Sequence, residues 1–383
     1  MKRMILAGLA IMIACSSGCT THLPPHAELT RAVKQSFDAS GFNYRSQSHI
    51  THLSLPKLDA EAAPKDKKLQ AGLAAFNLVR GFSVATKGAV DQKGQRAEVL
   101  YDLHYNKDNV ELSLRLPLLI DYRTQTIYIG PSFIHTLLSV VAPQETNGKE
   151  LLLQINIPEL LRQEAATSPS LAKMADEKLL GALNMDIFSA AMKDAINTSL
   201  QRIDPARFSD QPLTADDRAA GVDRSIRVEL GQDDAIATVS TLITSMAQAL
   251  RQQGVISEEE QTLLLTLTDK EVLSSLTKEI DLGMTQDVGV SSAGLVRSLR
   301  SQIRVADRAG NIAIGLESTN LFDRYGAPTF TIQPEASHLL DIREMLDSLK
   351  SLAPAKNGEP AAAPQAPDAE GDACCPDEDV VGA

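Results

Sequence analysis

Tryptophan is absent from this chain of 383 residues, and aromatic residues make up only 4% of it. A chain so poor in aromatic side chains offers few stacking platforms for nucleic-acid bases or sugars. Basic residues are also in the minority, since 37 Lys and Arg stand against 49 Asp and Glu, which gives a formal net charge of −12. This balance disfavours binding to nucleic acid and electrostatic docking on anionic lipid.

Cysteine is scarce, with four residues in the whole chain. Two of them, Cys15 and Cys19, stand near the start, and Cys374 and Cys375 are adjacent in an acidic stretch near the end. No disulfide framework is therefore predicted to hold the body of the protein together. The adjacent pair could bind a soft metal, pair with a partner's thiol, or simply belong to a dispensable tail.

The signatures of common catalytic sites are missing as well. The sequence contains no HExxH, GxSxG, Walker or GxGxxG motif. His49 and His52 are close in sequence, but in a strand their side chains would face opposite sides and could not share a metal. We therefore predict no catalytic residues, no cofactor and no metal, and we expect that the protein is not an enzyme.

What is present begins with a secretory signal. Lys2 and Arg3 precede an apolar run over residues 4–14, which is too short to span a bilayer as a helix. No later stretch reaches the roughly 18 uninterrupted apolar residues of a spanning helix. We predict a cleaved signal peptide over residues 1–18.

The signal ends in Ser16-Ser17-Gly18-Cys19, which resembles the lipobox of bacterial lipoproteins. The resemblance implies that Cys19 receives lipid, palmitate included, and becomes the mature N-terminus. Cys15 is the alternative acceptor. Thr20 stands where an inner-membrane lipoprotein of this type carries Asp, so the resemblance implies an outer-membrane anchor, with the body facing the periplasm or exposed at the surface.

A meander of strands follows. Period-two alternation broken by Gly, Asn and Asp clusters is typical of antiparallel strands with one buried and one wet face. The alternating apolar positions are Phe76, Leu78, Phe82, Val84 and Val90, then Ala97, Val99, Tyr101, Leu103 and Tyr105, then Val110, Leu112, Leu114 and Leu116. Shorter alternating runs fall at 42–53, 151–157, 226–230, 280–290, 295–305 and 312–316, with a last strand at 330–334.

Helical spacing of apolar residues occupies the remaining parts of the chain. Leu29, Val33 and Phe37 form one stripe, and capping boxes at Ser257 and Thr268 predict two short helices. The other helices are expected over 132–141, 171–203 and 236–250, with a final one around Leu339 to Leu349. Residues 204–223 are polar and form the clearest internal break.

These elements predict an α+β fold with about ten or eleven strands. Each half alone would leave sheet edges and an apolar face uncovered, so we favour one continuous, strongly curved antiparallel sheet, a half-open barrel with a helical lid on its concave face. Two separate domains are the alternative. We predict a tether over 19–27, a single domain over 28–350 and a disordered, acidic tail rich in Ala and Pro over 351–383.

This order of elements resembles the LolA, LolB and LppX families of envelope lipoproteins. The resemblance implies a cavity for a hydrophobic ligand between sheet and lid. The sequence-based candidates for that cavity are the apolar residues Phe76, Phe82, Tyr101, Tyr105, Leu112, Met192, Met246 and Met284.

Two functions follow as hypotheses. The first is a non-enzymatic lipoprotein, held to the membrane by its N-terminal lipid, that binds or carries lipid or an acylated protein. The second is a structural or assembly lipoprotein that docks an envelope protein partner. Neither involves nucleic acid.

Overall fold

The computed structural model describes residues 23–54, 81–107, 109–130, 151–165, 185–252, 254, 256–266, 268, 278–308, 313–336 and 338–345. Several predictions from the sequence lie outside these residues: the signal peptide, Cys15 and Cys19, Phe76, the helix at 132–141, the helix after Thr268, and the tail with Cys374 and Cys375. Contacts divide the chain into two units, Met1–Ile342 and Arg343–Ala383. The elements below belong to the first unit.

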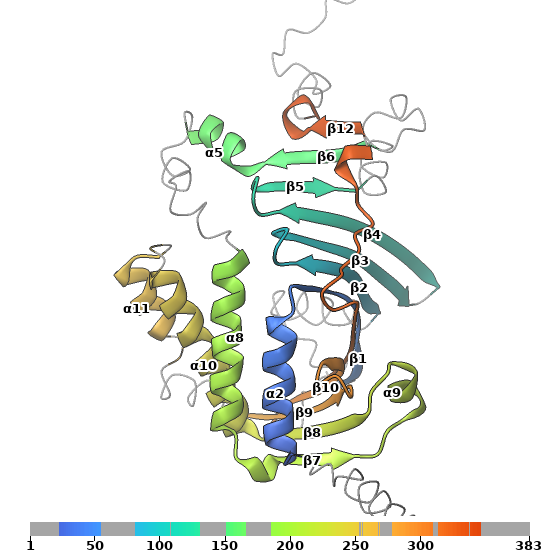
Figure 1. Cartoon of the computed structure of the whole chain (residues 1–383), viewed down its shortest axis with the longest axis vertical. Helices are drawn as coiled ribbons and strands as arrows, with labels where there is room; N and C mark the ends of the chain where they lie inside the picture. Colours follow the sequence, from blue (N-terminus) through green and yellow to red (C-terminus); the bar gives the residue numbers. More distant parts are fainter. Residues whose placement is uncertain are drawn as a thin grey trace, which may run out of the picture. The chain divides into compact units, whose positions relative to one another are not determined.

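Twelve strands form one mostly antiparallel sheet that does not close on itself (Figure 1). The strand order is β12-β6-β5-β4-β3-β2-β1-β11-β10-β9-β8-β7. Their bounds are β1 Gly41–Ser54, β2 Phe82–Asp91, β3 Arg96–Lys107, β4 Val110–Asp121, β5 Thr126–Ile129, β6 Leu151–Asn156, β7 Phe208–Gln211, β8 Arg224–Leu230, β9 Ile280–Val290, β10 Val296–Asp307, β11 Ala313–Asp323 and β12 His338–Asp341.

Strand β1 joins the two halves of the sheet. It pairs with β2 on one side and with β11 on the other, so strands from both ends of the sequence share one hydrogen-bonded surface. The α+β fold and the single continuous sheet are therefore confirmed, and the sheet has more strands than the alternation predicted.

Besides the strands, the described residues form α-helices and two short 3-10 helices, η2 and η3. Their bounds are α2 Pro25–Asp38, α5 Ile157–Ala165, α8 Met185–Arg202, η2 Pro205–Arg207, α9 Ala215–Ala219, α10 Gln232–Gln252, α11 Glu258–Thr266 and η3 Pro334–Ala336. Helix α2 begins at Pro25, inside the predicted tether, because proline suits the first turn of a helix. The capping box at Ser257 is confirmed: its amide donates to Glu260 Oε2 at 2.7 Å and its hydroxyl accepts from the Glu260 amide at 3.1 Å.

Three predictions about local structure were wrong. The polar break at 204–223 contains β7 and the short helix α9, because a four-residue edge strand needs little apolar patterning. The last strand predicted at 330–334 is not a strand. Residues 338–341 form β12, and the predicted final helix begins only at residue 342 and is described as far as residue 345. Strand β12 runs parallel to β6 and takes up the hydrogen-bonding groups along its edge.

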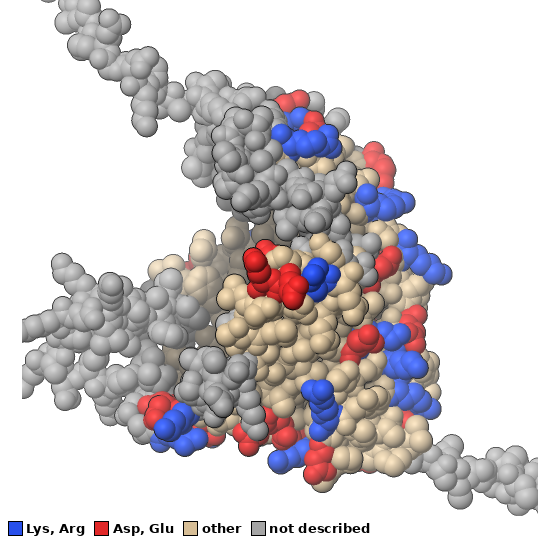
Figure 2. All heavy atoms as spheres, turned by 90° about the vertical axis from the view of Figure 1, so that its left-hand side faces the viewer, with Lys and Arg blue, Asp and Glu red and all other residues tan. Residues whose placement is uncertain are grey.

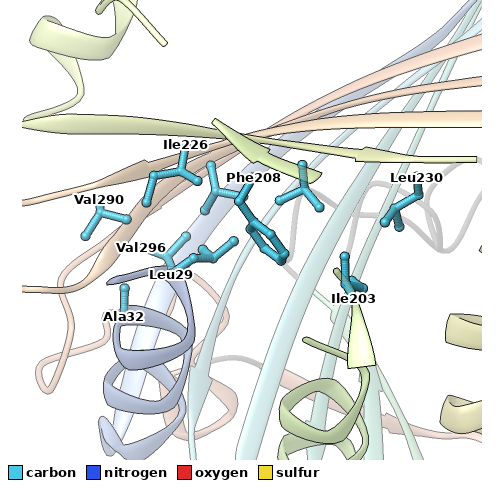
Figure 3. Packing of buried hydrophobic residues seen from close by; sticks show 10 residues of the cluster. Leu29, Ala32, Ile203, Phe208, Ile226, Leu230, Val290 and Val296 are labelled. Atoms are coloured by element: carbon cyan, nitrogen blue, oxygen red, sulfur yellow. The ribbon is translucent and has the colours of Figure 1, made fainter. Parts of the chain in front are cut away.

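One face of the sheet, which we call the inner face, packs against helices α2, α8 and α10 along strands β7 to β10. Figure 3 shows Leu29 and Ala32 of α2 beside Val290, Val296 and Ile226 of the strands. The register explains this face, because residues directly opposite one another in antiparallel strands point the same way. The buried cluster comprises Leu29, Ala32, Ile203, Phe208, Ile226, Val228, Leu230, Val288, Val290 and Val296.

The opposite face, which we call the outer face, has a different cover along strands β1 to β6. Residues 324–336, which we call the strap, cross it between β11 and β12. Buried Leu119 and Leu152 pack there with Ile332 of the strap. The carboxylate of Glu98, only 3% exposed, accepts from the amides of Thr331 and Ile332 at 2.7 and 2.6 Å, so the strap needs no partner strand.

Elsewhere the outer face carries cross-strand ion pairs. Arg227 and Asp287 are joined by two hydrogen bonds at 2.7 and 2.9 Å, and Arg115 bonds Asp102 at 2.6 Å. Figure 2 shows small groups of basic and acidic side chains next to one another on the described surface, separated by uncharged areas. The outer face therefore combines the apolar contact with the strap and cross-strand ion pairs, whereas the inner face beside the helices is apolar.

Candidate functional site

A cavity of about 630 Å³ lies between the inner face and helices α2, α8 and α10. Helix α2 contributes Leu29, Val33 and Phe37 to its lining. Strands β1 and β11 add Phe42 and Phe322. Ligand pockets in proteins generally measure about 300–1,000 Å³, so this cavity has room for a ligand of ordinary size.

The hydroxyl groups in the lining already have partners within the protein. Ser199 donates to the Ala195 carbonyl at 2.8 Å, and Thr238 donates to the Asp234 carbonyl at 2.8 Å. Ser36 accepts from the Val296 amide at 2.9 Å. Ser199 and Thr238 have thus used their single O–H donors inside their own helices and keep only acceptor capacity, while Ser36 is tied to β10.

Tyr325 also lines the cavity, and its hydroxyl likewise has a partner within the protein. Its hydroxyl donates to the Val296 carbonyl at 2.6 Å. Burial raises the pKa of Tyr325 to about 12, and the hydrogen bond with Ser36 and the charge of Arg297 only partly oppose that rise. The phenol is therefore neutral at physiological pH and adds no charge to the site.

Gln286 is the one lining residue with a side-chain amide. It points to the inner face between Met284 and Val288 of β9, and its Nε2 lies 3.8 Å from the Met284 sulfur. A thioether is a weak acceptor, so this contact leaves most of the hydrogen-bonding capacity of the amide unused. The cavity as a whole is thus apolar, with one neutral polar group in its wall.

Of the candidates predicted from the sequence, Met284 lines the cavity. Phe82, Tyr105 and Leu112 lie side by side on the same face in β2, β3 and β4, and the rings of Phe82 and Tyr105 are 4.9 Å apart. Met284 belongs to a row of residues that lie opposite one another in neighbouring strands and point to the inner face. From β8 to β1 this row consists of Leu230, Met284, Ile303, Leu316 and Ile50, so it runs from the cavity in the direction of β2.

The other candidates are placed elsewhere. Tyr101 and Leu112 are 37% and 58% exposed and line none of the cavity. Met192 in α8 and Met246 in α10 are half-buried, and they too are outside its lining. Phe76 lies outside the described residues.

The sequence reasoning did not propose the residues that helix α2 contributes to the cavity. A pattern in the sequence could have suggested them, because the three residues of the predicted helical stripe, Leu29, Val33 and Phe37, all line the cavity. A stripe spaced in steps of about four identifies a buried face, but it does not tell whether that face packs against side chains or borders a void.

A second, polar pocket of about 490 Å³ lies at the junction between β8 and α10. It is lined by Arg207, Gly231, Gln232, Asp233, Asp234, Lys278 and Arg308. Arg207 Nε lies 3.3 Å from Asp234 Oδ2. Three cations and two carboxylates therefore line this pocket, which we call the cationic pocket.

Two further features bear on the site. Within the part of the chain that the structure describes, no three His, Cys, Asp or Glu side chains gather as a metal site would require. None of the described helices combines the length and apolar character needed to cross a membrane. No protein-family model matches the sequence, and no curated protein matches it either.

Proposed function

We propose that this protein is a non-enzymatic envelope lipoprotein that binds a hydrophobic ligand, either lipid or an acylated protein, in the apolar cavity. In this proposal α2, α8 and α10 act as the lid of a half-open barrel of the LolA and LppX type. The observation that carries the proposal is the cavity of about 630 Å³ between those helices and the sheet. A binding role needs a pocket but no reacting groups.

The chemistry of the lining supports a hydrocarbon ligand. Apolar surface removed from water contributes roughly 25 cal/mol per Å², so a chain enclosed by Leu, Val, Phe and Met side chains is bound without directional contacts. Because the Ser199 and Thr238 hydroxyls donate to backbone carbonyls and Ser36 bonds the Val296 amide, a hydrocarbon ligand would not break these bonds.

Filling the cavity tests the proposal. Ser199 and Ala235 have small, buried side chains in the lining, so a Ser199→Leu/Ala235→Leu variant places two larger apolar groups in the void. We expect the affinity of the full chain for the neutral fluorescent probe N-phenylnaphthylamine to fall about tenfold or more, which corresponds to about 1.4 kcal/mol or more. The thermal midpoint should stay unchanged or rise, because filled voids gain contacts.

The matched control is Ala190→Leu/Ala237→Leu, which adds leucine to exposed positions of the same two helices and should leave probe binding unchanged. Probe binding that is equal in the filled variant, the control and the wild type would overturn the proposal. Lipid extraction of the purified protein followed by mass spectrometry gives an independent reading, since a carrier should retain apolar molecules in stoichiometric amounts.

The lipid anchor has its own test. Cells given radiolabelled palmitate should label the wild type and a Cys15→Ser variant, whereas Cys19→Ser should abolish the label and release the protein from the outer membrane. Labelling that depends on Cys15 would move the anchor to that residue. Labelling of neither would remove the lipoprotein assignment.

One observation favours the second candidate function, docking of a protein partner. Val110 and Leu112 at the start of β4 are 55% and 58% exposed on the inner face. A Val110→Ser/Leu112→Ser variant should then lose capture of an envelope protein while it keeps full binding of the fluorescent probe. Capture that survives the variant would contradict docking at this surface.

A further inference from the structure

The apolar cavity and the cationic pocket meet at a single short segment of the chain. Leu230, the last residue of β8, lines the cavity, and Gly231 lines the cationic pocket. At the start of α10, Asp234 lines the cationic pocket and Ala235 lines the cavity. Successive residues therefore line the two spaces. A third pocket of about 810 Å³ shares Leu230, Met284 and Ile303 with the cavity and Arg207 and Gly231 with the cationic pocket, so it borders both.

The charges of the cationic pocket are partly committed. Asp234 is neutralised by Arg207, and both aspartates stand in the first turn of α10, where the helix dipole stabilises negative charge. Lys278 and Arg308 form no ion pair with any residue that the structure describes. Within the described part of the chain, the pocket thus has two cations without an ion-pair partner and one such carboxylate, Asp233, in a protein whose formal net charge is −12.

We propose that the ligand is an anionic amphiphile, whose hydrocarbon chain occupies the cavity and whose phosphate, or chemically similar anion, binds beside Lys278 and Arg308. This inference rests on the proposed function and names the class of ligand. A charged head group is disfavoured in the cavity itself, because burial of an unpaired anion among apolar side chains is strongly unfavourable. The cationic pocket is where the same molecule finds its counter-charge.

The two cations are of the chemical kinds that bind a tetrahedral anion. A guanidinium group binds phosphate oxygens through a planar fork of N–H donors, and an ammonium group acts as a point charge. Lys278 precedes β9 and Arg308 follows β10, so the antiparallel pairing of these strands brings the two residues to the same end of the sheet.

The experiment displaces N-phenylnaphthylamine from the full chain with dodecyl phosphate or with dodecanol, which carry the same alkyl chain and differ in the head group. Both are used below the concentration at which they aggregate. We expect dodecyl phosphate to displace the probe at a concentration about tenfold lower than dodecanol, equivalent to about 1.4 kcal/mol for the anion. High salt should reduce the difference, because exposed charges are screened.

A Lys278→Gln/Arg308→Gln variant should bind the probe and dodecanol as the wild type does and lose the tenfold preference for dodecyl phosphate. The matched control, Lys34→Gln/Arg218→Gln, removes the same charge from exposed residues outside both pockets and should keep the preference. Equal displacement by the two amphiphiles, with normal probe binding, would overturn this inference and leave the proposed function standing. Absence of probe binding would instead refute the proposed function.

Inorganic phosphate distinguishes a free anion from a head group. It should weaken the advantage of dodecyl phosphate only at high concentration and leave probe binding intact. Tight binding of inorganic phosphate, with no advantage for dodecyl phosphate over dodecanol, would assign the cationic pocket to a free anion and overturn the amphiphile.

Discussion

The two halves of the sheet are covered on opposite faces. Along β7 to β10 the inner face is covered by α2, α8 and α10, whereas along β1 to β6 the outer face is covered by the strap. The strap contact is close-packed, with Leu119 and Leu152 only 1% and 2% exposed. The helix contact leaves the cavity beside an otherwise buried cluster.

The comparison shows how one sheet can form a close-packed contact with the strap on one face and leave space for a ligand under the helices on the other. The strap follows a cross-strand row on the outer face and bonds to it at Asn43 and Glu98. Among the described residues, isolated bonds such as that from the Val296 amide to Ser36 join the helices to the inner face, and side-chain packing supplies most of the remaining contact. Side-chain packing tolerates a void or a ligand better than a ladder of hydrogen bonds does.

The largest expected effect is a difference in the free energy of unfolding that two leucine-to-alanine substitutions remove. Leu119→Ala in the strap core should lower the free energy of unfolding by about 3 kcal/mol, because the cut leaves a void in a close-packed contact. Leu242→Ala in the cavity lining should cost about 1 kcal/mol, since that side chain already lacks neighbours on one side. Urea denaturation of both variants measures the difference, and equal losses would contradict the contrast between the two halves.

The next effect concerns the anchor of the strap. Glu98→Gln should cost about 2 kcal/mol, because the neutral amide loses the charge that strengthens the bonds from the Thr331 and Ile332 amides to Oε2, and it has no second oxygen to accept from the Thr331 hydroxyl. Probe binding to the cavity should not change. Glu335→Gln, in the same strap with its side chain 73% exposed, is the control and should cost less than about 0.5 kcal/mol. A similar loss in both variants would mean that Glu98 does not anchor the strap.

The smallest effect tests the outer face of the helix-covered half, where Asp217 of α9 bonds Arg300 of β10 at 2.8 Å. Burial raises the pKa of Asp217, but hydrogen bonds from Thr214 and the charge of Arg300 outweigh it, so the pKa lies below its ordinary value of 3.8. The carboxylate therefore stabilises the fold above that value, and the stabilisation is lost as the pH falls through the lower pKa of the folded protein.

Asp217→Asn should cost about 1.5 kcal/mol at neutral pH, and the gap to the wild type should close as the pH falls below about 3.8. Urea denaturation at a series of pH values measures it. Asp216→Asn, the exposed neighbour in the same helix, should show little loss at any pH. A gap that stays constant down to low pH would exclude the ionised carboxylate as its source.

Much of this architecture could be predicted from periodicity. Alternation of apolar residues identified β1 to β4, β6 and β8 to β10, and the stripe of Leu29, Val33 and Phe37 identified α2. Ser257 and Glu260 marked the start of α11 through their reciprocal bonds. These signals are local, since each depends on residues a few positions apart.

The strap shows where periodicity failed. Phe330 and Ile332 alternate like strand residues and are indeed packed in a core, but the amide of Ile332 bonds to Glu98. Its bonding partner lies 234 residues away in the sequence, so no local pattern could reveal that the segment is a strap. Residues 338–341 were misjudged for the same reason, because their partner is the edge of β6.

The sequence by itself determined the apolar face of the strands and helices that show clear periodicity, and the capped start of α11, because those depend on neighbouring residues. Only the tertiary structure decided that β1 joins the two halves, that the strap crosses the outer face, and that a cavity remains beside α2, α8 and α10. The physical reason is that a void is defined by the atoms that fail to fill it, and those atoms come from segments far apart in the chain.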